Sequence, residues 1–272
     1  TSGNSAALTS DIARAGGSID REFKIISAIE ATLPRDSIDA VAAHPDVAWI
    51  GLNSPVVSTG TFTVDLQALT TSYPISVNAN DPWSKSYTGA GVGVAVVDTG
   101  ISPSGHEDFK NNAGNSRVVA EVVVNSGTSN VTDGYGHGTH IAGIIGGDGG
   151  LAAGKYVGIA PEANLINVKI ADDSGASTVG DAIAGLQWVY ENRSAYNIRV
   201  VNLSLHSATA ESYRTSVLDA AVESLWFNGM FVVVAAGNLG SQPDAVGYPP
   251  ANDPFVMTVG AIDDMGTSAD GD

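Results

Sequence analysis

The stretch that decides the fold is Val92-Gly93-Val94-Ala95-Val96-Val97-Asp98. It is a short apolar run, rich in valine, that ends on a carboxylate. A strand with both faces covered has this composition, because neither face meets water. We therefore expect a buried strand over residues 92–97, with Asp98 at its carboxyl end.

Similar apolar runs recur along the chain and alternate with patterns typical of helices. This alternation predicts an α/β fold whose mostly parallel sheet is covered by helices on both faces. Ligands of such sheets bind beyond the carboxyl ends of the strands, so the chemistry is expected there. The further strands are expected at 118–124, 163–170, 200–205, 230–236 and 254–261, and the helices at 137–145, 178–191 and 213–227.

The amino-terminal part differs in pattern and reads as a separate small α+β module over residues 1–56. Its expected elements are a helix at 6–15, a strand around 23–29, a short helix at 35–43 and a strand at 47–50. A Ser-, Thr-, Gly- and Pro-rich linker covers residues 57–80, and the larger domain is expected at 81–272.

Composition limits the possible functions. The net charge of −17 disfavours nucleic acid as a partner, because binding phosphates needs a basic surface. No apolar run is long enough to span a bilayer, so no membrane contact is expected. The chain has no cysteine, which excludes disulfides, thiolate metal sites and a cysteine nucleophile.

A histidine between two glycines, His137, directly precedes the first expected helix of the larger domain. With small neighbours it can approach a second group closely, as a general base must, at about 3 Å. Asp98 is a candidate for the acid that orients it. Asn238 ends another apolar run and carries an amide that can stabilise an oxyanion. His140, three residues after His137, is interpreted as structural.

Five motifs around these residues follow one another along the chain. They are Val94-Ala95-Val96-Val97-Asp98-Thr99-Gly100-Ile101, His137-Gly138-Thr139-His140-Ile141-Ala142-Gly143, Gly158-Ile159-Ala160-Pro161-Glu162-Ala163, Val201-Asn202-Leu203-Ser204-Leu205 and Val234-Ala235-Ala236-Gly237-Asn238. Together they resemble the motifs of the subtilisin-like serine proteases, the subtilases. The resemblance covers residues 80–262 and implies a three-layer α/β/α fold.

The resemblance implies a serine endopeptidase that acts on polypeptides and requires no cofactor. Asp98 would be the acid of its catalytic triad, His137 the general base and Asn238 the side chain of the oxyanion hole. Polypeptide substrate would bind along Gly175, Ser177, Ser204, Leu205 and Gly237. His206 stands where the family usually has glycine, which changes the shape expected of the pocket.

Two further implications concern an ion and the amino-terminal module. Asp108 matches a position that often binds a structural calcium ion in the family. Residues 23–29, 33–34 and 41–50 resemble the later part of a subtilase propeptide, which assists folding and inhibits the enzyme. The chain's own propeptide would then be a partner, cleavage would fall within residues 53–60, and the enzyme would be secreted, with its signal peptide outside the chain.

The family's nucleophilic serine stands in Gly-Thr-Ser-Met-Ala at the start of a helix. Ser268 lies in Gly266-Thr267-Ser268-Ala269, but no methionine and no helical pattern follow it. It is also too close to Asn238 in sequence. The sequence therefore reads as a fragment that ends before the nucleophile and is inactive alone.

Three other interpretations compete with the protease. One is a subtilase-fold protein that binds peptides or its own prosegment without cutting. Another is an aspartic protease using Asp98 and Asp173, although that family is all-β. The third is a nucleotide-binding domain, but Gly89, Gly91 and Gly93 precede their strand, whereas a dinucleotide fingerprint follows it.

Overall fold

The structure is a computed structural model that describes residues 6–23, 28–48, 50, 63–102, 107–238 and 246–263. The chain forms two compact units, Thr1–Ser58 and Thr59–Asp272. Each unit has its own sheet and its own hydrophobic core. They are described separately.

The smaller unit is a two-stranded antiparallel sheet with helices. Helix α1 (Ala6–Arg14) precedes strands β1 (Ser18–Phe23) and β2 (Ala28–Thr32), and Leu8, Ile12 and Val41 form the buried core. A 3-10 turn, η2 (Arg35–Ser37), leads into helix α2 (Ile38–Ala42), where the sequence predicts one helix.

One expectation for this unit is wrong. Val47, Ala48 and Ile50 are not in a strand, and Trp49 lies outside the described residues. The Val47 N–H donates to the His44 carbonyl at 2.9 Å, so the chain turns here. Residues 24–27, within the strand expected at 23–29, also lie outside the described residues; β1 ends before them and β2 begins after them.

The larger unit contains a six-stranded sheet in which every neighbouring pair is parallel. All six residues of β3 are buried, as its apolar run predicts. The strand order is β4-β5-β3-β6-β7-β8, so the chain leaves β3 toward one side and later returns to pair on its other side. The strands are β3 (Gly93–Asp98), β4 (Val118–Val123), β5 (Asn164–Lys169), β6 (Ile198–Leu203), β7 (Phe231–Ala235) and β8 (Met257–Val259).

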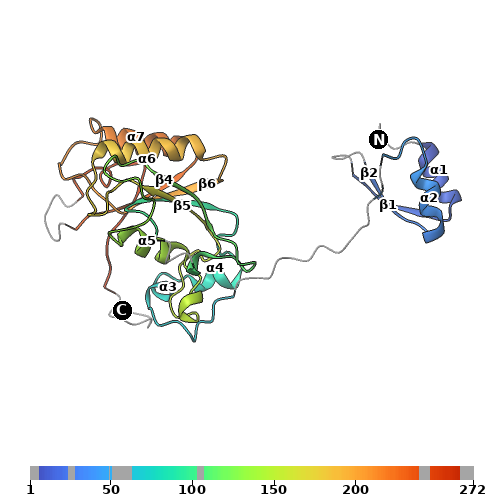
Figure 1. Cartoon of the computed structure of the whole chain (residues 1–272), viewed down its shortest axis with the longest axis horizontal. Helices are drawn as coiled ribbons and strands as arrows, with labels where there is room; N and C mark the ends of the chain where they lie inside the picture. The colour runs from blue at the N-terminus through green and yellow to red at the C-terminus, as the bar shows by residue number, and fades with distance from the viewer. Residues whose placement is uncertain are drawn as a thin grey trace. The chain divides into compact units, whose positions relative to one another are not determined.

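Three helices cover this sheet and complete the expected three-layer α/β/α fold. Helices α6 (Val179–Asn192) and α7 (Val217–Phe227) lie on one face, and α5 (His137–Gly146) lies on the other (Figure 1). Helix α7 begins later than the pattern predicts because Ser216 caps it, accepting the N–H of Asp219 at 3.2 Å.

The segment expected to be a loose linker contains the short helix α3 (Tyr73–Ser76), and a second short helix, α4 (Asn80–Ser84), begins at its last residue. Side chains dock them on the segment before β5: the Tyr73 hydroxyl donates to the Val157 carbonyl at 2.8 Å, and the Trp83 indole donates to the Ile159 carbonyl at 2.9 Å. Another 3-10 turn, η4 (Gly150–Ala152), follows α5.

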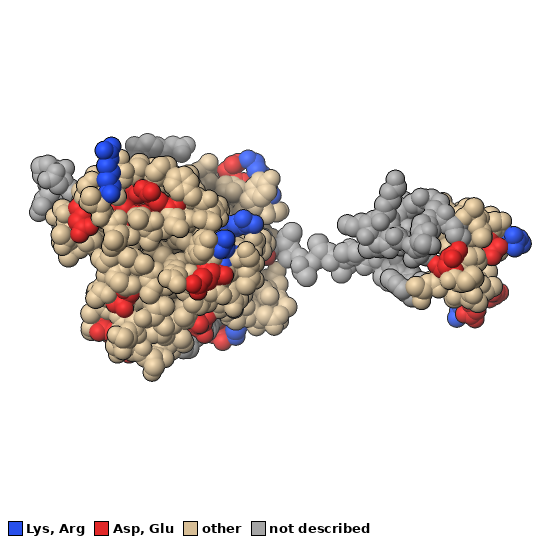
Figure 2. Space-filling view, turned by 90° about the horizontal axis from the view of Figure 1, so that it is seen from above, with Lys and Arg blue, Asp and Glu red and all other residues tan. Residues whose placement is uncertain are grey.

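Surface charge agrees with the acidic composition. On the face of the larger unit seen in Figure 2, Lys and Arg side chains are isolated and do not join into a continuous basic surface. Among the helices that the structure describes, none has the length and apolarity to cross a bilayer.

Candidate active site

The structure brings Asp98 and His137 together. The Nδ1 atom of His137 lies 2.7 Å from Oδ1 of Asp98. The Asp98 side chain is only 4% exposed, whereas that of His137 is 42% exposed. A buried carboxylate thus faces one nitrogen of a partly exposed imidazole.

The fold explains this placement. Asp98 ends β3, the strand at which the sheet order reverses, and α5 begins at His137. The two backbones approach closely because Gly138 has no side chain: a Cβ there would lie 2.3 Å from the Gly100 carbonyl oxygen. Gly100 itself has φ of 117°, a conformation that favours glycine.

Asn238 follows β7, at the same edge of the parallel sheet as Asp98 because all strands run in one direction. It is exposed, and Gly237 before it is half-buried with φ of 95°. The Ala236 N–H donates to the Val259 carbonyl at 2.9 Å, which holds the end of β7 against β8. The acid Asp98 at the end of β3, the base His137 at the start of α5 and the amide of Asn238 after β7 thus lie at one edge of one sheet.

A family match decides the identity. Residues 89–271 match the sequence profile of the Subtilase family, Peptidase S8. The chain belongs to the subtilase family. Relatives with similar sequences are Subtilisin E of Bacillus subtilis (strain 168), 34% identical over 92% of this chain and 60% of that protein, and Serine protease AprX of the same strain, 36% identical over 69% and 42%.

Solved structures agree with the fold. Sphericase superposes with a TM-score of 0.53 at 29% identity, covering 63% of this chain and 53% of that one. A cold adapted subtilisin-like serine proteinase superposes with a TM-score of 0.50 at 32% identity, covering 68% and 58%. The chain spans 60% of the length of Subtilisin E.

One segment of this subtilase that is expected to bind substrate is the loop after β5. Gly175 has φ of 85° and packs against the ring of Tyr135, where a Cβ would come within 2.9 Å. The Ser177 hydroxyl donates to the Ile170 carbonyl at 2.7 Å. Tyr135 is 59% exposed and connects this loop with the segment before His137.

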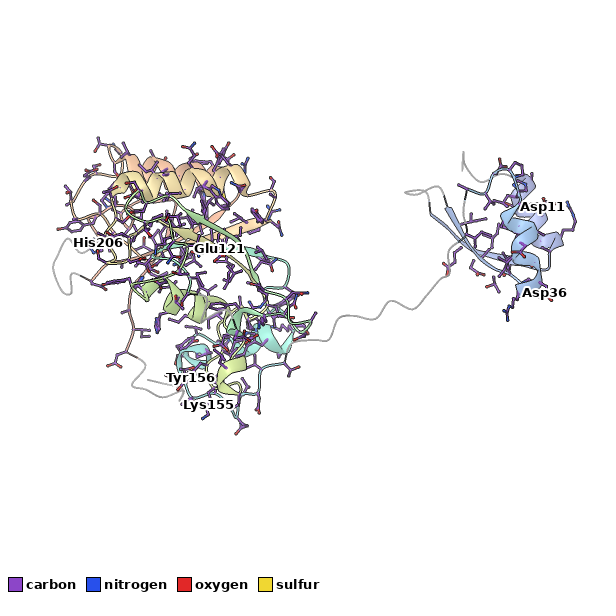
Figure 3. The ribbon with its side chains drawn as sticks, viewed as in Figure 1. Asp11, Asp36, Glu121, Lys155, Tyr156 and His206 are labelled. Atoms are coloured by element: carbon purple, nitrogen blue, oxygen red, sulfur yellow. The ribbon has the colours of Figure 1, made fainter. Side chains whose placement is uncertain are left out.

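The other segment expected to bind substrate follows β6. Ser204 accepts a hydrogen bond from Asn202 Nδ2 at 2.9 Å, and Leu205 packs against the larger core. The His206 ring, labelled in Figure 3, contacts Tyr248 edge-on at 5.9 Å between centroids. A ring therefore occupies the position at which subtilases usually have glycine.

Asp108, at the position that would bind calcium, makes hydrogen bonds. Its Oδ1 accepts the N–H of Leu151 at 2.7 Å, and its backbone carbonyl accepts the N–H of Asp148 at 2.8 Å. Within the described ranges, no three His, Cys, Asp or Glu side chains group in a way that could hold a metal ion. His140, which is exposed, likewise belongs to no such group. The calcium site stays a prediction.

Two other interpretations do not fit the geometry. Asp98 and Asp173 do not form the carboxylate pair of an aspartic protease, because Asp98 contacts His137 and Asp173 contacts Lys169 at 2.6 Å. The sheet is parallel and covered by helices, not all-β. Gly89 and Gly91 precede β3, as the sequence indicates, whereas the glycines of a dinucleotide fingerprint follow their strand.

Ser268, which the sequence analysis rejects as the nucleophile, lies outside the described residues.

Sequence reasoning missed Asp133. Its carboxylate joins the loop after β3 to the start of α5 through Thr99 and Thr139. Burial opposes ionisation of this carboxyl, but hydrogen bonds from Thr139, Gly136 and Thr99 prevail and lower the pKa of Asp133. An aspartate before Gly134 is typical of an ordinary turn. The signal available in the sequence was a threonine close after each candidate residue, Thr99 directly after Asp98 and Thr139 two residues after His137.

Proposed function

We propose that this subtilase is a serine endopeptidase that cleaves polypeptides by acyl transfer through a Ser-His-Asp triad. The observation that carries the proposal is the 2.7 Å contact between His137 Nδ1 and the buried carboxylate of Asp98. His137 would take the proton of the serine and later give it to the leaving amine. Asp98 would hold the imidazole in the required tautomer and stabilise the imidazolium.

The amide of Asn238 would donate to the oxyanion of the tetrahedral intermediate, a contribution worth about 10²–10³ in kcat for this family. Gly175 and Ser177, on one side, and Ser204, Leu205 and Gly237, on the other, would bind the substrate backbone. Pairing of this kind adds the peptide as an extra strand. None of these steps needs a cofactor.

The nucleophile is the missing part. We propose that it is a serine outside residues 1–272, so that these residues alone do not complete acyl transfer. The absence of a Gly-Thr-Ser-Met-Ala motif in the sequence supports this proposal. Removing one member of a triad eliminates most of its benefit, because the three act as a unit.

The test uses a form of the protein that extends through the proposed serine. It should hydrolyse casein and react with a serine-directed phosphonate, and His137→Ala should abolish both. Full hydrolysis by the His137→Ala variant would reject the triad. Peptide binding without hydrolysis in the extended protein would favour the non-catalytic alternative.

We also propose that residues 1–56 are a propeptide that assists folding and inhibits the secreted enzyme, with cleavage within 53–60. The alignment with Subtilisin E supports this, because it extends over 92% of the chain and thus beyond the residues of the family match. Residues 1–56 added as a separate peptide should inhibit casein hydrolysis by the processed enzyme; a peptide without effect would contradict this role.

A further inference from the structure

The carboxylate of Asp133 accepts five hydrogen bonds. On Oδ1 the donors are the Thr99 hydroxyl at 2.8 Å, the Tyr135 N–H at 3.1 Å and the Gly136 N–H at 2.7 Å; on Oδ2 they are the Thr139 N–H at 2.8 Å and the Thr139 hydroxyl at 2.7 Å. A carboxylate offers about four lone-pair sites, so this one is saturated. Only an ionised carboxylate accepts from all these donors at once.

The two threonine hydroxyls link opposite segments. Thr99 follows the acid, and its oxygen accepts the N–H of Gly138, next to the base, at 2.9 Å. Thr139 stands two residues after the base, and its oxygen accepts the N–H of Ser102, on the acid's loop, at 2.8 Å. Each hydroxyl therefore crosses from one catalytic segment to the other.

The direction of both links depends on Asp133. A hydroxyl has a single proton, and here both protons are donated to the carboxylate. The lone pairs are thereby free to accept the crossing N–H groups. In Asp133→Asn, an NH₂ group would replace one of the two carboxylate oxygens. This NH₂ donor would face hydroxyl and N–H groups that are themselves donors, so the hydrogen bonds made by that oxygen would be lost.

The segment that carries Asp133 is itself held by the sheet. The buried Asn167 side chain donates to the Val131 carbonyl at 3.0 Å, and the fully buried Lys169 ammonium donates to the Thr132 carbonyl at 2.5 Å. Both come from β5, the neighbour of β3. Asp133 is thus fixed from the strand beside the one that ends at Asp98.

We propose that Asp133 is a positioning residue of the catalytic pair: acting through the hydroxyls of Thr99 and Thr139, it sets the distance and direction between Asp98 and His137. The catalytic part of this role rests on the proposed function. The geometric part concerns only the contact between His137 and Asp98.

The geometric part is tested on the 272-residue chain by proton NMR. At low temperature the proton between His137 Nδ1 and Asp98 should give a low-field signal, assigned by its loss in His137→Gln. Asp133→Asn should remove this signal. Asp172→Asn is the matched control, because Asp172 Oδ1 also accepts two backbone N–H groups and a hydroxyl, at 2.9, 3.0 and 2.7 Å, all within its own loop; it should keep the signal.

A second pair of variants covers the case in which Asp133→Asn does not fold, as judged by circular dichroism. Thr99→Val should lose the signal and Thr99→Ser should keep it, because only serine retains the linking hydroxyl. Persistence of the signal in a folded Asp133→Asn, or equal behaviour of the two Thr99 variants, would overturn the proposal.

Kinetics separate this role from the proposed function. In the form that extends through the serine, Asp133→Asn should lower kcat about 10²-fold, the loss expected of a misplaced catalytic group, and leave KM within about twofold. A rise in KM of the same size with kcat unchanged would contradict a positioning role for Asp133. If that form hydrolyses nothing while the NMR results hold, the proposed function fails and the geometric role of Asp133 stands.

Discussion

The start of α5 is held by hydrogen bonds and by the close approach of Gly138, whereas α6 and α7 pack on the opposite face of the sheet mainly through large apolar side chains. Gly138 and Gly146 are buried on α5, and Leu186, Leu218 and Leu225 are buried on α6 and α7. Hydrogen bonds fix both distance and direction, and apolar packing is non-directional. The helix start that these hydrogen bonds fix is the one that carries His137, although the rest of α5 also packs against an apolar cluster.

The half-buried Asp133 beside α5 and two buried acids of the opposite face differ in how their carboxylates are paired. Asp133, beside α5, has a donor for every lone pair, and the pKa of this carboxyl is lowered. Among the described residues, both oxygens of Asp219 and Oδ2 of Asp253 have no hydrogen-bond partner, although these acids are only 0% and 4% exposed. Burial raises the pKa of Asp219, and it raises the pKa of Asp253 to about 6.

The largest expected effect separates activity from stability. In the form that extends through the serine, Asp98→Asn should lower kcat by about 10⁴-fold, as loss of the acid does in a subtilisin triad. Its melting temperature should change less than that of Leu186→Ala, which opens a cavity on the other face and should cost about 2–5 kcal/mol. Equal losses of stability in the two variants would mean that the main role of Asp98 is to stabilise the fold and not to orient His137.

Gly138→Ala should be the most damaging small change on the α5 face. The added Cβ would lie 2.3 Å from the Gly100 carbonyl oxygen and 3.1 Å from the Asp98 Cβ, so the start of α5 must move. We expect the free energy of unfolding to fall by about 3 kcal/mol, the upper range for overpacking. We also expect the low-field proton signal of His137 to disappear. Denaturant unfolding and NMR measure the two; a stable variant with an intact signal would show that the close approach is dispensable.

The opposite face should respond to pH. Because the folded-state pKa of Asp253 is about 6, above its unfolded value, the folded state binds more protons between about pH 4 and 6, and stability falls as pH rises through that window. Burial is the main cause, and the negative charges of Glu223 and Asp219 add to it. Asp253→Asn should make this decline shallower, leaving the part that comes from the raised pKa of Asp219, and should stabilise the protein at pH 8 by about 1–2 kcal/mol.

Asp65→Asn is the matched control for this pH effect. The carboxylate of exposed Asp65 accepts the N–H of Gln67 at 3.0 Å, as that of Asp253 accepts the N–H of Phe255 at 2.7 Å, but without burial. Unfolding free energies of both variants and the unchanged chain, measured from pH 4 to 8, test the difference. A curve for Asp253→Asn that parallels that of the unchanged chain would contradict the role of burial.

The sequence predicted those features that depend on long, regular patterns. The valine-rich run ending at Asp98 and the Gly-His-Gly start of α5 marked the strand and helix that meet at the site. Helices α3 and α4 were not predicted because they have at most five residues and are docked by single contacts of Tyr73 and Trp83. Asp133 was missed because its partner Thr99 is 34 residues away in sequence.

The smallest expected effect tests whether closeness matters along all of α5. Gly143 lies in the middle of the same helix as Gly138, but a Cβ there would meet no atom within 4 Å. Gly143→Ala should therefore stabilise the protein by about 0.5–1 kcal/mol, because alanine loses less backbone entropy in a helix. It should leave the His137 signal unchanged. Destabilisation by this variant in denaturant unfolding would mean that the whole helix, and not only its start at the site, depends on glycine.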